Sequence, residues 1–398
     1  MKRGTWGLIA AAALLSLASL KLLPAPFIWA GLAWTACLAL GVVMERGTAV
    51  RLLLLCAATA ALTLTGAEAW FWLFWTPRPE EVLSRKGFYP SDSILGWRTL
   101  PGATRATKRR GTQIIYDVTY DIDSAGWRVM PPDTARTAPG CVVLFVDSFV
   151  FGQGLQDSQT LPWLLRLRTM GRYRVFSLSE PGYGPEQMLV SLERGVVAGL
   201  PCRPTDVIYE ALLDHTLLVS GELWFARRGP HYDLAADGTL NYLGETWARP
   251  PVPVQGPAAR CVTEQLAKSR LYTVLSGRAL LPTASDFKLY FAIVARVSAV
   301  LQAEYPGVAF HVLVWQPITS RYARYAATFL AGLRRTTPHV HVVNDLLPGF
   351  AANPLAYRND RTDPHPNARA DAVLVDWIAR CILHVEGAGP TQPPTCTN

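Results

Sequence analysis

The feature that most constrains the fold is a run of apolar residues that begins at Cys141 and ends abruptly in Asp147-Ser148. Glycines at positions 152 and 154 follow, before a helix-like segment. Such a run predicts a buried strand with Ser148 at its carboxyl end. In an open parallel sheet ligands bind beyond the carboxyl ends of the strands, and the turn that follows can point backbone N–H groups at an oxyanion. We therefore predict that Ser148 is a nucleophile.

A base for this serine is found near the end of the chain, in Asp363-Pro-His365-Pro, just before a segment with helical periodicity. We expect His365 to take the proton of Ser148 and return it to the leaving group. Asp363 or a backbone carbonyl would hold the imidazole ring in the correct tautomer. Asp360 is the alternative carboxylate.

Strand-like and helix-like segments alternate through the second half of the chain. The strands are expected at 141–147, 173–178, 206–213, 309–315 and 339–344, and the helices near 160–169, 185–198, 284–304, 322–335 and 368–383. This alternation predicts an α/β fold, with a parallel sheet covered by helices on both faces.

Three motifs, in this order, resemble the blocks of the SGNH/GDSL hydrolases: Asp147-Ser148, the stretch Glu180-Pro-Gly182-Tyr-Gly184, and Asp363-x-His365. The resemblance implies a three-layer, flavodoxin-like SGNH hydrolase fold over residues 140–386 and an ester hydrolase activity. The upstream stretches 92–98 and 118–128 look like the leader of membrane-anchored bacterial members of this family.

Two positions depart from the family pattern. Val146 stands where the family has the glycine of Gly-Asp-Ser, and Asp214, followed by His215, stands where it has an asparagine that donates to the oxyanion. An ionised aspartate cannot donate a hydrogen bond. We therefore expect an oxyanion hole made of the Ser148 and Gly182 N–H groups, with His215 or a protonated Asp214.

The amino-terminal part of the chain holds long uncharged stretches, at 4–20, 22–44 and 52–67, the last continuing past Glu68 into an aromatic cluster at 70–75. About 20 apolar residues span a bilayer, so we predict three transmembrane helices, with Glu68 reaching the interface. The cations Lys2, Arg3, Arg46 and Arg51 place the amino terminus in the cytoplasm by the positive-inside rule. The large domain would then be periplasmic, at a bacterial inner membrane. A signal peptide is the alternative.

The expected organisation is a transmembrane region at 1–76, a polar linker and β-rich leader at 77–139, the hydrolase-like domain at 140–386 and a tail at 387–398. An insertion at 217–282 follows the third block and is expected to flank the active site. Of the seven cysteines, Cys141 is expected to be a buried free thiol. We expect bridges between Cys202 and Cys261 and between Cys381 and Cys396, with other pairings open.

A net charge of +8 raises the question of nucleic acid, but the charge is dispersed and we expect no such partner. The densest cluster is Arg105 with Lys108, Arg109 and Arg110. We interpret it as a solvated face or a contact with anionic lipid, with an acidic polysaccharide as the alternative. Neither a cofactor nor a metal is expected.

Three functions remain open on the sequence. The first is a membrane-anchored ester hydrolase acting on acyl, such as acetyl, esters of cell-envelope or exported polysaccharide. The second is an O-acyltransferase that passes an acyl group from serine to a sugar. A membrane acyltransferase partner would supply that acyl group. The third is a non-catalytic carbohydrate-binding or scaffold protein.

Overall fold

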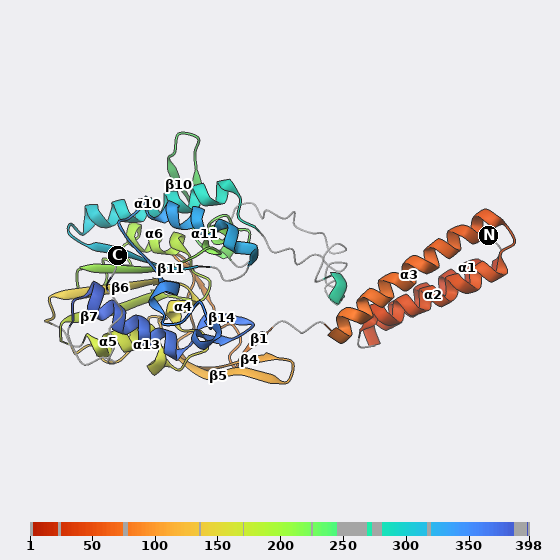
Figure 1. The fold of residues 1–398 in the computed structure, drawn as a ribbon, viewed down its shortest axis with the longest axis horizontal. Helices are drawn as coiled ribbons and strands as arrows, with labels where there is room; N and C mark the ends of the chain where they lie inside the picture. Colours follow the sequence, from red (N-terminus) through yellow and green to blue (C-terminus); the bar gives the residue numbers. More distant parts are fainter. Residues whose placement is uncertain are drawn as a thin grey trace. The chain divides into compact units, whose positions relative to one another are not determined.

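The computed structural model describes residues 3–22, 25–74, 79–134, 137–169, 171–223, 226–244, 269–272, 281–316, 320–385 and 396. The chain divides into two compact units. One holds the three amino-terminal helices together with residues 269–272, and the other holds residues 79–244 and 281–385 (Figure 1). Each unit is described by itself.

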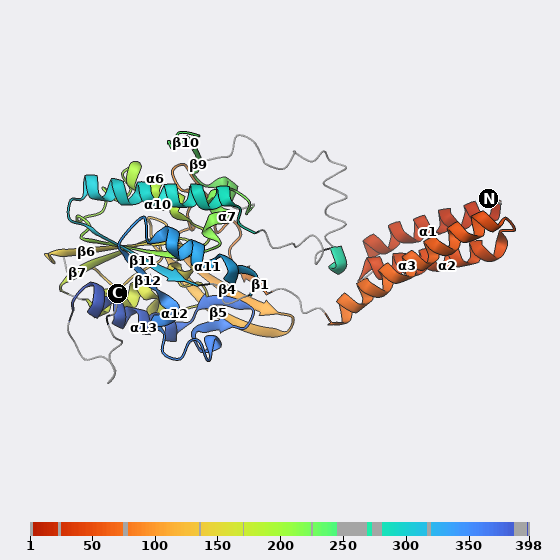
Figure 2. The ribbon, with the colours of Figure 1, turned by 45° about the horizontal axis from the view of Figure 1, so that its top comes forward.

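The amino-terminal unit is built from α1 (Arg3–Leu22), α2 (Pro26–Met44) and α3 (Thr48–Phe74), which lie side by side in both views (Figures 1 and 2). Helices α2 and α3 are long and apolar enough to cross a membrane, whereas the apolar stretch of α1 is shorter. Length and composition thus identify two candidate spans among the described residues, where the sequence predicted three. A signal sequence near the amino terminus would pass the same test.

Glu68, near the carboxyl end of α3, is buried in this unit. Its carboxylate accepts hydrogen bonds from the Ser269 hydroxyl at 2.7 Å and from the N–H groups of Arg270 and Leu271 at 2.8 and 2.9 Å. The Arg270 guanidinium lies over the Trp72 ring at 3.9 Å. Three donors from a distant segment thus satisfy the carboxylate inside the protein, and the expectation that Glu68 lies at the membrane interface stays a prediction.

The second unit is organised around a five-stranded parallel sheet. Its strands are β6 (Gly140–Val146), β7 (Tyr173–Ser179), β8 (Asp206–Leu212), β11 (Ala309–Trp315) and β12 (His339–Val342). They lie in the order β12-β11-β8-β6-β7 with every pair parallel. Numbered along the chain, this is the flavodoxin-like order 2-1-3-4-5, which reverses direction between β6 and β8. The predicted α/β fold class is confirmed.

Helices cover both faces of this sheet, because strand residues alternate between the faces. Val143 and Phe145 face α6 (Pro185–Glu193), α10 (Ala284–Glu304) and α11 (Ser320–Leu333). Val142 and Leu144 face α5 (Leu161–Arg168) and α13 (Ala368–Trp377). Figure 2 shows α6 and α10 on one side of the sheet and α13 on the other. The expected strands and helices are thus found within a few residues of their predicted bounds.

A second, antiparallel sheet precedes the parallel one. It is formed by β1 (Glu80–Leu83), β4 (Gly102–Arg110) and β5 (Gln113–Ile122), in the order β1-β4-β5. All three strands lie within residues 77–139, where a polar linker and a β-rich leader were expected. The residues of β1 pair with β4 from Glu80 opposite Arg109 to Leu83 opposite Ala106.

The remaining elements are short. The hairpin of β9 (His231–Leu234) and β10 (Leu240–Gly244) turns at Gly238, which has φ +88° as an Asp-Gly turn requires. The others are β2 (Ser91–Asp92), β3 (Gly96–Trp97), α4 (Ser148–Phe151), α7 (His215–Val219), α12 (Val343–Leu346), β13 (Arg358–Asp360) and β14 (Asp363–Pro366). Single turns of 3₁₀ helix cover Asp157–Gln159, Ala226–Arg228 and Pro354–Tyr357, and a π turn covers Ile378–Ile382.

The disulfide pattern differs from the prediction in part. Cys381 and Cys396 are bonded, as expected, but Cys141 is bonded to Cys202 and is not a free thiol. Cys261 lies outside the described residues. Cys202 meets Cys141 because β6 pairs with β8, which places the loop before β8 beside β6. The Cα atoms of the two cysteines lie 6.1 Å apart.

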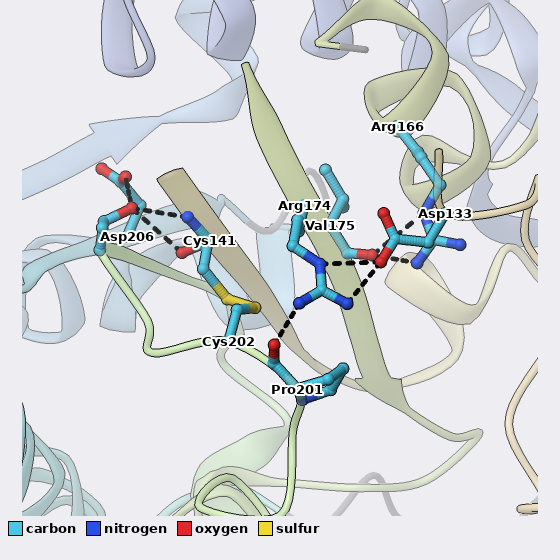
Figure 3. The surroundings of a disulfide bond; sticks show 9 residues. Asp133, Cys141, Arg166, Arg174, Val175, Pro201, Cys202 and Asp206 are labelled. Atoms are coloured by element: carbon cyan, nitrogen blue, oxygen red, sulfur yellow. Dashed lines mark hydrogen bonds and ion pairs between the residues drawn. A yellow bond between two sulfur atoms is a disulfide. The ribbon is translucent and has the colours of Figure 1, made fainter. Parts of the chain in front are cut away.

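The loop that carries this disulfide is held on the edge of the sheet by Arg174 of β7. Figure 3 shows its guanidinium between Asp133 and the Pro201 carbonyl. Arg174 Nε lies 2.8 Å from Asp133 Oδ2, and Nη1 donates to Pro201. A cation and a covalent bond therefore fix both sides of the loop.

Candidate active site

Ser148 is the first residue of α4, directly after β6. Asp147 caps this short helix, because its side chain accepts a hydrogen bond from the Phe149 N–H at 2.8 Å. Gly152 ends the helix in the left-handed region at φ +78°, where a Cβ would lie 2.4 Å from the Thr160 side chain. The strand end, the cap and the glycine together hold Ser148 at the point where the order of strands reverses.

The β13–β14 hairpin places the imidazole against this serine. His365 Nε2 lies 2.8 Å from Ser148 Oγ, and His365 Nδ1 is hydrogen-bonded to Asp363 Oδ1. Asp363 is fully buried, and its Oδ1 also accepts from the His365 N–H at 3.3 Å. The rival Asp360 instead accepts from Thr362 and pairs with Arg110 at 3.5 Å. The three predicted side chains have the geometry of a Ser–His–Asp triad.

A lysine from the leader sheet contacts the buried carboxylate. Lys108 Nζ of β4 lies 3.1 Å from Asp363 Oδ2. Burial by itself would raise the pKa of Asp363, but its hydrogen bond and charge interaction with His365, together with the charge of Lys108, lower the pKa to about 2. Asp363 is therefore ionised throughout the physiological range.

The predicted basic cluster is largely neutralised within the protein. Lys108 pairs with Asp363, Arg110 with Asp360, and Arg105 with Asp117. Three of its four cations thus have carboxylate partners, while Arg105 and Arg109 remain exposed, as a solvated face requires.

Lys108→Met is expected to make the fold more sensitive to acid. The pKa of Asp363 in the folded protein lies below its unfolded value, so Asp363 stabilises the fold above about pH 4, and this contribution is lost as the pH falls toward 2. Without Lys108 the pKa of Asp363 rises and the loss begins at a higher pH. Acid unfolding followed by circular dichroism would measure the shift of the midpoint. Arg109→Met, an exposed charge change on the same strand, serves as the control; equal midpoints for the two variants would contradict the expectation.

Two backbone N–H groups are available for an oxyanion. Within the described residues, neither the Ser148 N–H nor the Gly182 N–H forms a hydrogen bond. Gly182 has φ +87°, which favours glycine. The leader holds its loop, because Trp97 Nε1 donates to the Pro181 carbonyl at 3.2 Å and Tyr183 OH donates to the Trp97 carbonyl.

Buried polar groups also support this loop. Glu180 is completely buried and accepts a hydrogen bond from the Thr99 hydroxyl at 2.8 Å. Burial raises the pKa of Glu180 well above its usual value. Glu180 thus supports the loop through its hydrogen bond with Thr99.

His215 does not face the expected oxyanion position as a donor. Its Nε2 lies 3.1 Å from Asp147 Oδ2, and its Nδ1 accepts from the Leu212 N–H at 3.3 Å and contacts Tyr209 OH at 3.1 Å. Because Nδ1 accepts, Nε2 carries the hydrogen and donates to Asp147. We correct the expectation for His215: both ring nitrogens are occupied, and the residue holds the cap of the serine helix.

Asp214 is exposed toward the same cavity as Ser148. Its carboxylate caps no helix N–H. Partial removal from water raises the pKa of Asp214, and the charge of Asp147 raises it further. The expectation that a protonated Asp214 donates to the oxyanion stays a prediction.

Arg128, from the second leader motif, supports the far end of the serine helix. Its Nη1 donates to the carbonyls of Phe151 and Gly152, both at 2.7 Å, and Nη2 donates to the Leu155 carbonyl at 2.6 Å. Nε pairs with Asp157 at 2.6 Å. The carbonyl groups at the end of a helix have no partner within the helix, and the buried guanidinium donates hydrogen bonds to them.

A cavity of about 690 Å³ opens over Ser148 and His365. Its walls are largely apolar and aromatic, and they include Trp97, Phe149, Leu218, Leu223, Trp315 and Tyr322. Leu218 and Leu223 belong to the predicted insertion, which therefore flanks the cavity as expected. The volume suits a small ester in a pocket with few polar groups.

Lys108, Arg128 and the link between His215 and Asp147 were not singled out as parts of the site from the sequence. Lys108 belonged to a noted basic cluster and Arg128 to a noted leader motif, so a weak signal existed for both. Nothing in the spacing of His215 and Asp147 indicated their contact.

No protein-family model matches the chain. No curated protein matches it either. The chain is similar to the solved structure of TesA, with 14% identity over 60% of this chain and 95% of that chain, at a TM-score of 0.33. It is also similar to the acetyl xylan esterase Est2A from the rumen bacterium Butyrivibrio proteoclasticus, with 8% identity over 63% and 65% of the two chains, at 0.31. A carbohydrate esterase family 2 enzyme from Corynascus thermopiles (Myceliophthora fergusii) matches with 15% identity over 76% and 86%, at 0.32. Likenesses this distant add nothing to what the geometry of the site supports.

Proposed function

We propose that this protein is a serine ester hydrolase in which Ser148 is the nucleophile, His365 the general base and acid, and Asp363 the group that orients the imidazole. The observation that carries this proposal is the 2.8 Å contact between Ser148 Oγ and His365 Nε2, with His365 Nδ1 bonded to the buried Asp363. A nucleophile, a base and an orienting carboxylate in this order are the requirements of acyl transfer through serine.

In this mechanism His365 Nε2 takes the hydroxyl proton while Ser148 Oγ bonds to the ester carbonyl carbon. The Ser148 and Gly182 N–H groups donate to the oxyanion that forms. When the tetrahedral intermediate collapses, the carbon–alcohol bond breaks and His365 gives its proton to the departing alcohol. Water then attacks the acyl-serine by the same route, and Ser148 regains its proton.

We further propose that the enzyme is anchored in a bacterial inner membrane, with the hydrolase domain on the periplasmic side. The two apolar helices α2 and α3 support an anchor, and the two disulfides support an oxidising compartment. Acyl esters of cell-envelope or exported polysaccharide are the substrates that such a location would offer.

The direct test uses the full chain in detergent micelles. We expect a fluorophosphonate to label the Ser148 peptide, as seen by mass spectrometry, and we expect release of p-nitrophenol from p-nitrophenyl acetate. Ser148→Ala should lose both. Labelling without hydrolysis would favour the O-acyltransferase, whose acyl-serine awaits a sugar acceptor and a membrane partner. Absence of labelling would overturn the nucleophile and favour a binding or scaffold protein.

Asp214→Asn is expected to preserve or raise the hydrolysis of p-nitrophenyl acetate. The substitution removes a carboxylate from the cavity and adds an amide that can donate to the oxyanion, and one such donor typically contributes about 10²–10³-fold to turnover. The measurement is kcat for both proteins at one pH. A loss as large as that of Ser148→Ala would show that Asp214 itself is needed for activity.

A further inference from the structure

The cavity over the triad contains a cation with no partner in the described part of the chain. Arg358, the first residue of β13, lines this cavity and is half-buried. Its guanidinium forms no hydrogen bond or ion pair with any described residue. The half-buried cations of the leader differ, since Lys108 and Arg110 both pair with carboxylates. Burial lowers the pKa of Arg358.

A second arginine lines the same cavity. Arg228 is exposed, and its Nη2 donates to the Tyr89 carbonyl at 3.2 Å and the Ser91 hydroxyl at 3.3 Å. Both partners are neutral, so its charge is also not balanced by a described carboxylate. Two acids line the cavity: Asp147 is bonded to Phe149 and His215, and Asp214 forms no ion pair with either arginine in the described part of the chain.

A guanidinium that is partly removed from water without a partner is costly. It is also a rigid fork whose N–H groups fit a carboxylate or a phosphate in a bidentate manner. A ligand that brings an anion into this cavity would satisfy Arg358.

The position of Arg358 indicates which part of an ester would carry the anion. Arg358 and His365 come from the two strands of the β13–β14 hairpin, and both residues line the cavity. His365 protonates the departing alcohol, so the alcohol part of the ester must lie on the His365 side of the cavity. Building on the proposed hydrolase function, we propose that the natural substrate is an ester whose alcohol part, such as a sugar, carries a carboxylate or a phosphate that Arg358 binds. Arg358 is then a residue that determines specificity.

The test compares esters that differ in charge, using the full chain in detergent micelles. The probes are a monoacetylated methyl glucoside, the matching monoacetylated methyl glucuronoside, and a monoacetylated methyl glucoside 6-phosphate. We expect kcat/KM to be about tenfold or more higher for at least one anionic ester than for the neutral one. The anionic ester that is preferred shows whether Arg358 binds a carboxylate or a phosphate.

Arg358→Gln should bring the ratio of anionic to neutral kcat/KM close to one. Arg361→Gln, which removes an exposed charge from the turn of the same hairpin, should keep the wild-type ratio. If Arg358→Gln does not fold, Arg358→Lys replaces it. Lysine keeps the charge but lacks the forked guanidinium, so we expect a ratio between those of the wild type and one. An unchanged ratio would count against Arg358 as the residue that binds the anion.

Two results would overturn the inference. One is an equal kcat/KM for neutral and anionic esters in the wild type. The other is an Arg358-dependent preference for p-nitrophenyl hemisuccinate over p-nitrophenyl pentanoate, which would place the anion on the acyl part. Failure of the proposed hydrolase function would look different, since no ester, charged or neutral, would then be cleaved in a Ser148-dependent way.

Discussion

Replacing His365 with alanine is expected to lower kcat/KM for p-nitrophenyl acetate by about 10⁴-fold or more. His365 is the group bonded to Ser148 Oγ, so its loss leaves the hydroxyl without a base and the departing alcohol without an acid. Any remaining rate would come from binding and the two backbone N–H groups. The measurement is steady-state hydrolysis on purified full-length protein.

His339→Ala provides a matched control, because His339 is an exposed histidine of β12 and does not line the cavity. We expect its activity to match the wild type. Should the His365 variant retain more than a tenth of the wild-type rate, the imidazole would not be the base and the assignment of the triad would be wrong.

Arg128→Met is expected to lower the free energy of unfolding by about 3–5 kcal/mol, as for other buried pairs that lose one member. Methionine keeps much of the volume but removes every donor. The carbonyls of Phe151, Gly152 and Leu155 and the carboxylate of Asp157 would then lie without their cation. Urea unfolding followed by tryptophan fluorescence would measure the change.

The comparison for this effect is Arg105→Met, in β4 of the same leader segment. Arg105 pairs with Asp117 at the surface, where water screens the charges and an ion pair contributes little. Its unfolding midpoint should stay close to that of the wild type. If the two variants have the same unfolding midpoint, Arg128 contributes no more to stability than an exposed ion pair and does not support the serine helix.

The segment that precedes the parallel sheet contacts each part of the candidate site. Lys108 reaches Asp363, Trp97 holds the Gly182 loop, and Arg128 holds the end of the serine helix. We infer that the segment before the parallel sheet supports the catalytic geometry and is more than a spacer after the apolar helices.

Local patterns in the sequence predicted the elements of the parallel sheet. Apolar runs predicted β6, β7, β8, β11 and β12 because buried strands and their alternating helices leave a periodic signal along the chain. The residues Ser148, Asp363 and His365 were likewise predicted, because each follows a recognisable strand end or precedes a helix.

Contacts between segments far apart in the chain left no such signal. The Cys141–Cys202 bond follows from the pairing of β6 with β8, and the contact of His215 with Asp147 depends on which way a buried ring points. Periodicity reports which face of an element is buried, but not which charge or thiol lies opposite it. The sequence alone therefore determined the α/β fold class and the candidate triad. Only the tertiary structure decided the partners of Lys108, His215 and Cys141, and it gives Arg358 none among the described residues.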